Sequence, residues 1–135
     1  MVRQTRTVKV TEAEVKVFLD KAGQFMESAQ DALAKGNWDA AVHNAVHCVI
    51  SANDALLGAR HGLRSSSQNH KDAATLLADK VGTGEARKNA SRFVKIINKK
   101  NLVQYEGRSV SAAEARSLMV DATRFFEWSK SKITR

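Results

Sequence analysis

The chain of 135 residues contains no proline and only 7 glycines, which limits the folds open to it. Proline is the residue that most strongly breaks a helix from within, so its absence leaves long helices uninterrupted. Apolar residues recur at steps of three and four, the spacing that places them on one face of a helix. No stretch alternates apolar and polar residues for long enough to predict a strand. We therefore predict an all-α protein, an up-and-down bundle of four to five helices joined by short loops.

Local signals mark the ends of the predicted helices. Thr11 followed by Glu14 is a capping box, in which each side chain accepts a hydrogen bond from a backbone N–H at the start of a helix. Ser111 and Glu114 repeat this pattern before the last helical segment. Residues 58–69 are rich in glycine, serine and other polar residues, so we predict a loop between the second and third helices.

Composition and cysteine content exclude several classes of protein. The chain is 43% hydrophobic and 27% charged, as in ordinary globular proteins. We assign residues 1–10 to a basic N-terminal tail and residues 11–135 to a single helical domain. Cys48 is the one cysteine, which excludes an intramolecular disulfide framework, and its apolar surroundings predict a buried thiol. Because no apolar run reaches the roughly 18 residues of a membrane span and no signal segment is found, we expect no membrane association and a cytoplasmic location.

The formal net charge of +8 is distributed unevenly along the sequence. Residues 84–108 contain seven basic and two acidic residues, and four of the basic ones fall on one face of the predicted fourth helix. A row of cations repels itself and is stabilised by an anionic partner, so this face predicts binding of RNA or another polyanion. The alternative is a solvated face that aids solubility. The predicted nucleic-acid-binding residues are Lys88, Arg92, Lys95, Lys99 and Arg108.

The end of the fourth helix is unusually polar on its apolar side. Past Ile97, the direction of the apolar stripe is continued by Asn101 and Gln104, with Lys100 at one edge and Tyr105 at the other. Burying an amide or an ammonium group without a partner costs about 2 kcal/mol or more. Either the helix therefore ends before these residues, or they line a cleft or the interface with a second copy of the chain.

Three stretches of the sequence stand out together: GNWDAA at residues 36–41, NHKD at 69–72 and KNLVQY at 100–105. In this order and spacing they resemble HEPN domains (higher eukaryotes and prokaryotes nucleotide-binding), and the resemblance extends from about Val15 to Ile133. It implies a small helical homodimer in which the two copies of the fourth helix face each other across a cleft. It also implies that the protein binds or acts on RNA or nucleotides, in some members as a toxin paired with a nucleotidyltransferase-type antitoxin.

The resemblance also implies a site. Ribonuclease members carry an arginine, a polar residue and, after a short spacer, a histidine; the arginine holds the phosphate and the histidine acts as acid or base without a metal. In this chain Lys100 takes the arginine position, Asn101 the polar position, and Tyr105 the position of the histidine or its aromatic neighbour. Lysine binds phosphate as a point charge, whereas tyrosine, with a pKa of ~10, is a poor base at neutral pH.

We therefore predict a module that binds RNA or nucleotide phosphates, with no cofactor and no bound metal, and take Lys100, Asn101 and Tyr105 as candidate site residues. A metal-independent endoribonuclease toxin using the same cleft is the second hypothesis. The third is a protein-interaction module that binds no nucleic acid.

Two other combinations of residues have the spacing of a functional site. Arg64 and His70 have the spacing of the ribonuclease pair but lie in the predicted loop. His43 and His47 are four residues apart with Asp54 on the same side, a spacing that suits a metal. No third ligand can be identified, so we favour histidines that face solvent or a second copy.

Overall fold

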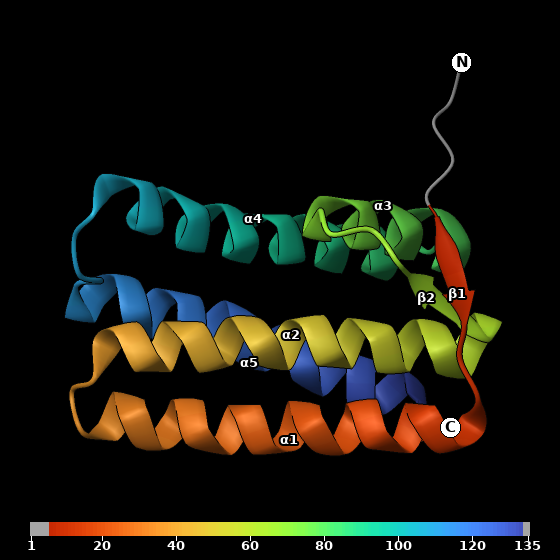
Figure 1. Ribbon diagram of the computed structural model, residues 1–135, viewed down its shortest axis with the longest axis horizontal. Coiled ribbons are helices and arrows are strands. Elements are labelled where there is room, and N and C mark those ends of the chain that lie inside the picture. Colours follow the sequence, from red (N-terminus) through yellow and green to blue (C-terminus); the bar gives the residue numbers. More distant parts are fainter. Residues whose placement is uncertain (1–5, 134–135) are drawn as a thin grey trace.

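Five helices make up most of the molecule (Figure 1). The computed structural model describes residues 6–133. The chain forms, in order, β1 (Thr7–Lys9), α1 (Glu12–Ala34), α2 (Trp38–His61), β2 (Leu63–Ser65), α3 (His70–Val81), α4 (Gly84–Glu106) and α5 (Ala112–Ile133). α1 and α2 form an antiparallel pair, α5 packs against α2, and α3 and α4 form the upper layer in Figure 1. The predicted all-α bundle of four to five helices is confirmed.

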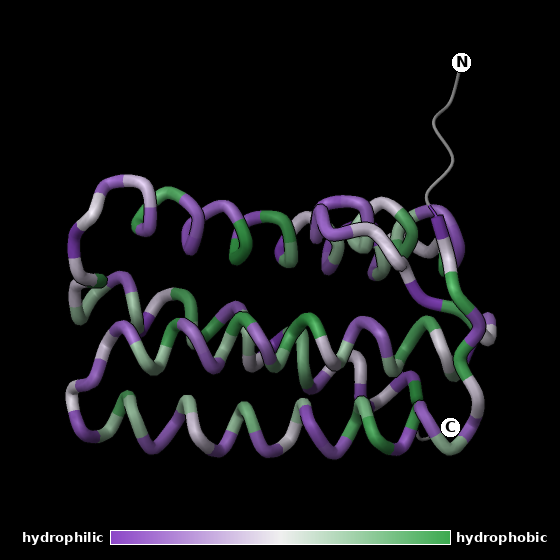
Figure 2. The backbone as a smooth tube through the Cα atoms, viewed as in Figure 1, coloured by the Kyte–Doolittle hydropathy of each residue, from purple (hydrophilic) through white to green (hydrophobic). Residues whose placement is uncertain are grey.

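The hydrophobic core lies around α2, which packs against the other four helices. Hydrophobic residues recur on the side of α1 that faces α2, while its outer side is hydrophilic (Figure 2). Phe93 of α4 and Phe125 of α5 are fully buried, with ring centroids 5.6 Å apart. Cys48 is buried as predicted, and burial raises the pKa of its thiol to about 12. No helix within residues 6–133 is both long and apolar enough to cross a membrane.

Both predicted capping boxes are present. The Thr11 hydroxyl accepts a hydrogen bond from the backbone N–H of Glu14 (3.2 Å), whose carboxylate accepts one from the N–H of Thr11 (3.0 Å). Ser111 and Glu114 form the same pair of bonds at 3.1 and 3.0 Å. At the C-terminal end of α4, Gly107 adopts the left-handed conformation (φ 62°), which ends the helix. Glycine tolerates this conformation without a steric penalty.

The expectation that the chain contains no strand was wrong. β1 and β2 pair antiparallel, with Val8 opposite Arg64, and α2 continues to His61 inside the predicted loop 58–69. Strands of three residues are too short for an alternating pattern, and their partners are more than fifty residues apart in the sequence. Residues 7–10, assigned to the basic tail, therefore belong to the fold, and Val10 is buried. Residues 1–5 of that tail lie outside the described residues.

A close approach between α2 and the N-terminal segment makes Gly58 sensitive to substitution. In an ordinary helix, replacing glycine by alanine stabilises by about 1 kcal/mol. Here an added Cβ would lie 2.6 Å from Cγ1 of Val10 and 3.0 Å from Cγ2 of Val15. We therefore expect Gly58→Ala to lower the free energy of unfolding by about 1–3 kcal/mol in urea titrations. The cost should shrink in a Val10→Ala background; an equal cost in both backgrounds would contradict this explanation.

Candidate functional site

α4 continues well past its apolar half, to Glu106. The alternative that the helix ends before its polar residues is therefore wrong. The inward stripe, however, passes from Ile97 through half-buried Lys100 to buried Val103, while Asn101 is exposed and Tyr105 is 92% exposed. Lys100, placed at the edge of the stripe by the sequence pattern, thus takes the inward position. Asn101 and Tyr105 therefore lie on the surface of the single chain, and their place at an interface between two copies stays a prediction.

Lys100 lines a small cavity between α2 and the C-terminal half of α4. The cavity has a volume of about 220 Å³. Its walls come from the start of α2, the end of α4 and the segment that follows: Asp39, Val42, His43, Lys100, Val103, Gln104, Arg108 and Val110. Lys100 and His43 therefore line the same recess, although α2 and α4 are far apart in the sequence.

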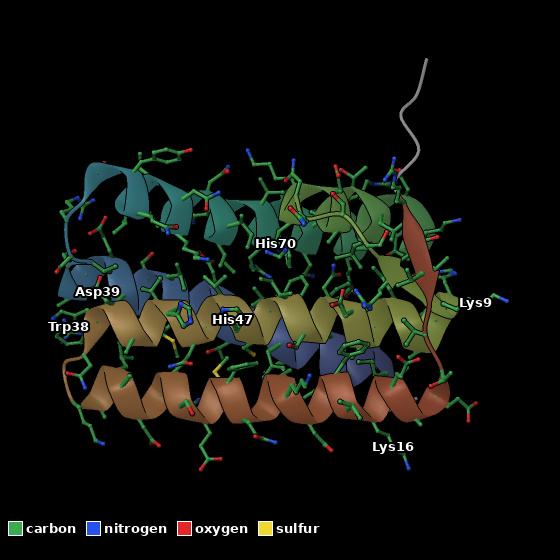
Figure 3. The ribbon with its side chains drawn as sticks, viewed as in Figure 1. Lys9, Lys16, Trp38, Asp39, His47 and His70 are labelled. Atoms are coloured by element: carbon green, nitrogen blue, oxygen red, sulfur yellow. The ribbon has the colours of Figure 1, made fainter. Side chains whose placement is uncertain are left out.

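Two further histidines lie close to Lys100. The imidazole rings of His43 and His47, one turn apart on α2, have centroids 4.6 Å apart, and the His47 ring also packs at 5.3 Å from Phe25 of α1. His70 is the first residue of α3, directly after the N-cap Asn69, and lies above His47 in Figure 3. We call His43, His47, His70 and Lys100 the histidine–lysine cluster.

The cluster is poor in negative charge. Burial lowers the pKa of His47, and the charges of His43, Lys100 and His70 lower it further. Burial and the charge of Lys100 also lower the pKa of His70. Within residues 6–133, no carboxylate forms an ion pair or a hydrogen bond with any of the four side chains. At neutral pH the imidazoles of His47 and His70 are therefore mostly neutral, and Lys100 supplies the positive charge.

Most of the predicted basic face of α4 is paired within the chain. Asp121 of α5 lies 3.8 Å from Nε of Arg92 and 3.2 Å from Nζ of Lys95, across a groove of about 680 Å³ between α4 and α5. The anionic partner that this row of cations favours is thus provided in part by α5. Lys88 is exposed and forms no ion pair among the described side chains.

Glu114 pairs with the two remaining basic residues of the predicted set. Its carboxylate lies 2.7 Å from Nζ of Lys99 and accepts two hydrogen bonds from the guanidinium of Arg108, at 2.7 and 2.8 Å. Arg108 also pairs with Glu106. Hydrogen bonds from Arg108, Lys99 and Ser111 hold the pKa of the Glu114 carboxyl well below its ordinary range. Glu114 therefore joins the end of α4 to the start of α5.

The other two combinations from the sequence do not form sites of the expected kind. The guanidinium of Arg64 lies over the ring of Phe18 (5.6 Å), and its charge opposes the rise that burial causes in the pKa of Asp54. No interaction among the described residues joins Arg64 to His70. In the part of the chain that the structure describes, no three histidine, cysteine or acidic side chains are placed to hold a metal ion.

Comparison with known proteins identifies the family. A model of the HEPN domain matches residues 15–133, from the first turn of α1 to the last residue of α5. The chain belongs to the HEPN domain family. A search of curated proteins gave no match. The match confirms the resemblance seen in the sequence, and it spans all five helices and the whole histidine–lysine cluster of this HEPN protein.

Sequence reasoning found all four members of the cluster but assigned them to separate hypotheses. His43 and His47 were weighed as metal ligands, His70 as the partner of Arg64, and Lys100 as part of the family motif. The one local signal for the cluster was the four-residue spacing of His43 and His47, which places both on the same side of α2. Their approach to His70 and Lys100 depends on how α3 and α4 pack over α2.

Proposed function

We propose that this HEPN protein binds phosphate groups of RNA or of a nucleotide at the C-terminal half of α4, with Lys100 as the anchoring cation. The observation that carries the proposal is the difference between Lys100 and its neighbours. Lys100 is half-buried and has no ion-pair partner among the described residues, whereas Lys95 and Lys99 on the same helix are paired with carboxylates of α5. An ammonium group partly removed from water and left without a counter-ion favours binding of an anion.

The exposed side of the same helix end extends the proposed site. Asn101, Gln104 and Tyr105 border a depression of their own at the same helix end and are all exposed. These side chains are available to the sugar and base of a bound nucleotide. A longer strand has further proposed contacts along the helix: Lys88, Arg92, Lys95, Lys99 and Arg108. Such a strand must compete with the carboxylates of Asp121 and Glu114 for all of these side chains except Lys88.

The proposal includes a homodimer in which the ends of α4 from two copies face each other. Two exposed apolar or aromatic side chains at this end, Leu102 (50% exposed) and Tyr105, support it because such groups are favoured in interfaces. Sedimentation equilibrium tests this part directly, and a single subunit at high concentration would rule it out. The family resemblance further supports a cytoplasmic role in a toxin–antitoxin or defence system with a nucleotidyltransferase-type antitoxin, which co-purification from cells producing both proteins would test.

Replacing Lys100 with alanine should weaken RNA binding. A hydrogen bond to a charged group contributes about 1.5–3 kcal/mol, so we expect a loss of roughly tenfold to a hundredfold in affinity. Fluorescence anisotropy with a labelled single-stranded oligoribonucleotide measures this, with Lys16→Ala as the control because Lys16 lies exposed on α1, away from the cluster (Figure 3). Binding of the native protein should also weaken between low and moderate salt. If Lys16→Ala and Lys100→Ala bind alike, Lys100 is not the anchor; if no RNA binds at any salt concentration, a protein-interaction module is favoured instead.

A second candidate function, metal-independent RNA cleavage, is favoured by the position of the histidines. A neutral imidazole can accept the proton of a ribose 2′-hydroxyl, and His47 and His70 lie beside the cation that would hold the phosphate. Tyr105 is then not needed as a base. Cleavage of RNA in the presence of a chelator, lost in His47→Gln, would support this candidate. Native protein that leaves varied RNAs intact would rule it out.

A further inference from the structure

A second cavity lies at the end of the bundle opposite to Lys100. Its volume is about 390 Å³, within the roughly 300–1,000 Å³ of pockets that hold small molecules. α2 and α5 end on this side of the molecule, on the right in Figure 1, whereas α4 ends on the left. We call it the Trp128 cavity. Most of its lining consists of charged and aromatic side chains from four helices: Arg60, His61, Lys80, Glu85, Trp128 and Lys132.

The cations of the Trp128 cavity come from the ends of three helices. Arg60, Lys80 and Lys132 lie in the last turns of α2, α3 and α5, respectively. A positive side chain is favoured there by the partial negative charge of a helix C-terminus. Because the three helices end around one cavity, charges that each stabilise a single helix end are brought together.

The lining of the cavity has more positive than negative charge. Three cationic side chains line it together with one carboxylate, that of Glu85. Oε2 of Glu85 lies 3.3 Å from Nζ of Lys132 and accepts a hydrogen bond from Nε1 of Trp128 at 3.2 Å. Among residues 6–133, Arg60 and Lys80 form no ion pair, and both are exposed. Like charges around one cavity repel one another, so an anion bound between them is favoured.

We propose that the Trp128 cavity is a second anion site, which binds the phosphate part of a small ligand with at least two negative charges. Three cations and one carboxylate leave an excess of positive charge that a dianion balances. A phosphomonoester carries about 1.5 to 2 negative charges at neutral pH and has three acceptor oxygens, which suits cations that come from three helices. A carboxylate has one charge and two oxygens. The volume leaves room for an organic group beside Trp128 and Val81.

This inference is independent of the proposed function. Glu85 and Lys100 are fifteen residues apart on α4, which is about 22 Å along the helix axis. No side chain lines both the Trp128 cavity and the cavity at Lys100. A ligand can therefore occupy one cavity while the other stays empty.

The two tryptophans of the chain provide a separate signal for each cavity. Trp128 lines the proposed site, and its indole N–H donates to Glu85. Trp38 is the first residue of α2 and precedes Asp39, which lines the cavity at Lys100. A ligand in the Trp128 cavity should therefore shift the indole N–H signal of Trp128 and leave that of Trp38 in place.

Titration of the protein at constant ionic strength, followed by the indole signals in proton–nitrogen NMR spectra, tests the inference. The probes are adenosine diphosphate, pyrophosphate and adenosine, and Trp38→Phe assigns the two signals. We expect adenosine diphosphate and pyrophosphate to shift the Trp128 signal to saturation. Adenosine has no phosphate and should not shift it. If neither anion shifts the signal, or if adenosine shifts it as much as the diphosphate does, the inference is wrong.

Arg60→Ala and Lys80→Ala should each weaken the binding of adenosine diphosphate roughly tenfold, because each removes a cation from the lining. Both residues are exposed, so these variants should fold as the native protein does. Arg87→Ala is the matched control: Arg87 is also exposed near the start of α4, but it lines a different groove, between α3 and α4. Equal weakening in all three variants would mean that the diphosphate responds to the general charge of this end of the molecule, which would overturn the assignment to the cavity.

Lys100→Ala separates the two proposals. The variant should bind adenosine diphosphate at Trp128 with the affinity of the native protein, because distant sites act independently. A Trp128 signal that no phosphate shifts, together with RNA binding that Lys100→Ala weakens, would overturn this inference alone. A saturable shift of the Trp128 signal, together with RNA binding that Lys100→Ala leaves unchanged, would support this inference and contradict the proposed function.

Discussion

Phe93→Ala should lower the free energy of unfolding by about 3–5 kcal/mol, the range found when a buried phenylalanine is truncated. Phe93 is fully buried and packs against the equally buried ring of Phe125, so α5 and α4 both lose contacts when the ring is removed. Ion pairs between Lys95 and Asp121 and between Lys99 and Glu114 also join these two helices. Urea titration followed by circular dichroism measures the change.

Two controls limit the interpretation of the Phe93 experiment. Phe93→Leu keeps most of the buried volume and should cost clearly less than the alanine variant. Val120 on α5 is 49% exposed, so Val120→Ala should change the stability by no more than about 0.5 kcal/mol. A cost below about 1 kcal/mol for Phe93→Ala would mean that α4 is less tightly packed on α5 than the structure indicates.

Asp54→Asn should stabilise the protein at neutral pH. Burial raises the pKa of the Asp54 carboxyl from its ordinary 3.8 to about 6, although the charge of Arg64 opposes the rise. Between these two values the folded protein binds the proton more tightly than the unfolded chain does, so stability falls as the pH rises through this window. The ionised carboxylate therefore costs up to about 3 kcal/mol above pH 6, and asparagine removes this cost.

The measurement compares unfolding of the Asp54→Asn variant and the native protein at pH 4 and pH 7.5. The stability advantage of the variant should be small at pH 4 and increase to about 1–3 kcal/mol at pH 7.5. Comparing the two proteins at each pH cancels the contributions of His47 and His70, which titrate in the same range. Asp20→Asn is the control, since Asp20 is exposed on α1. An advantage that is the same at both pH values would show that the carboxylate of Asp54 is solvated in the folded protein.

Much of the fold follows from signals that act over one or two helical turns. The pairs Thr11 with Glu14 and Ser111 with Glu114 are three residues apart, so their hydrogen bonds depend on the local backbone alone, and both formed as expected. The order of the helices was predictable for the same reason. The two short strands were not, because β1 and β2 are stabilised by pairing with each other rather than by a pattern within either segment.

The candidate site was only partly predictable because its charges depend on tertiary packing. Lys99 and Lys100 are adjacent in the sequence and equally basic. Packing pairs Lys99 with Glu114 of α5 and places Lys100 at the cavity that His43 of α2 also lines. A helical projection of α4 alone describes one continuous basic face, because it contains neither the carboxylates of α5 nor the histidines of α2 and α3.

The pairing of β1 with β2 has a consequence for motion near the site. Two strands of three residues form few backbone hydrogen bonds, so they belong to the part of a fold that separates locally at low free energy while the helices stay intact. β2 leads through Ser67, whose hydroxyl donates to Asp72 at 2.7 Å, directly to the start of α3 and the imidazole of His70. Transient detachment of the amino-terminal strand would loosen the support of this one histidine, while His43 and His47 stay fixed on the central helix. Amide hydrogen exchange should therefore be faster in residues 63–69 than in α2, and the geometry of the site should fluctuate on the side of α3.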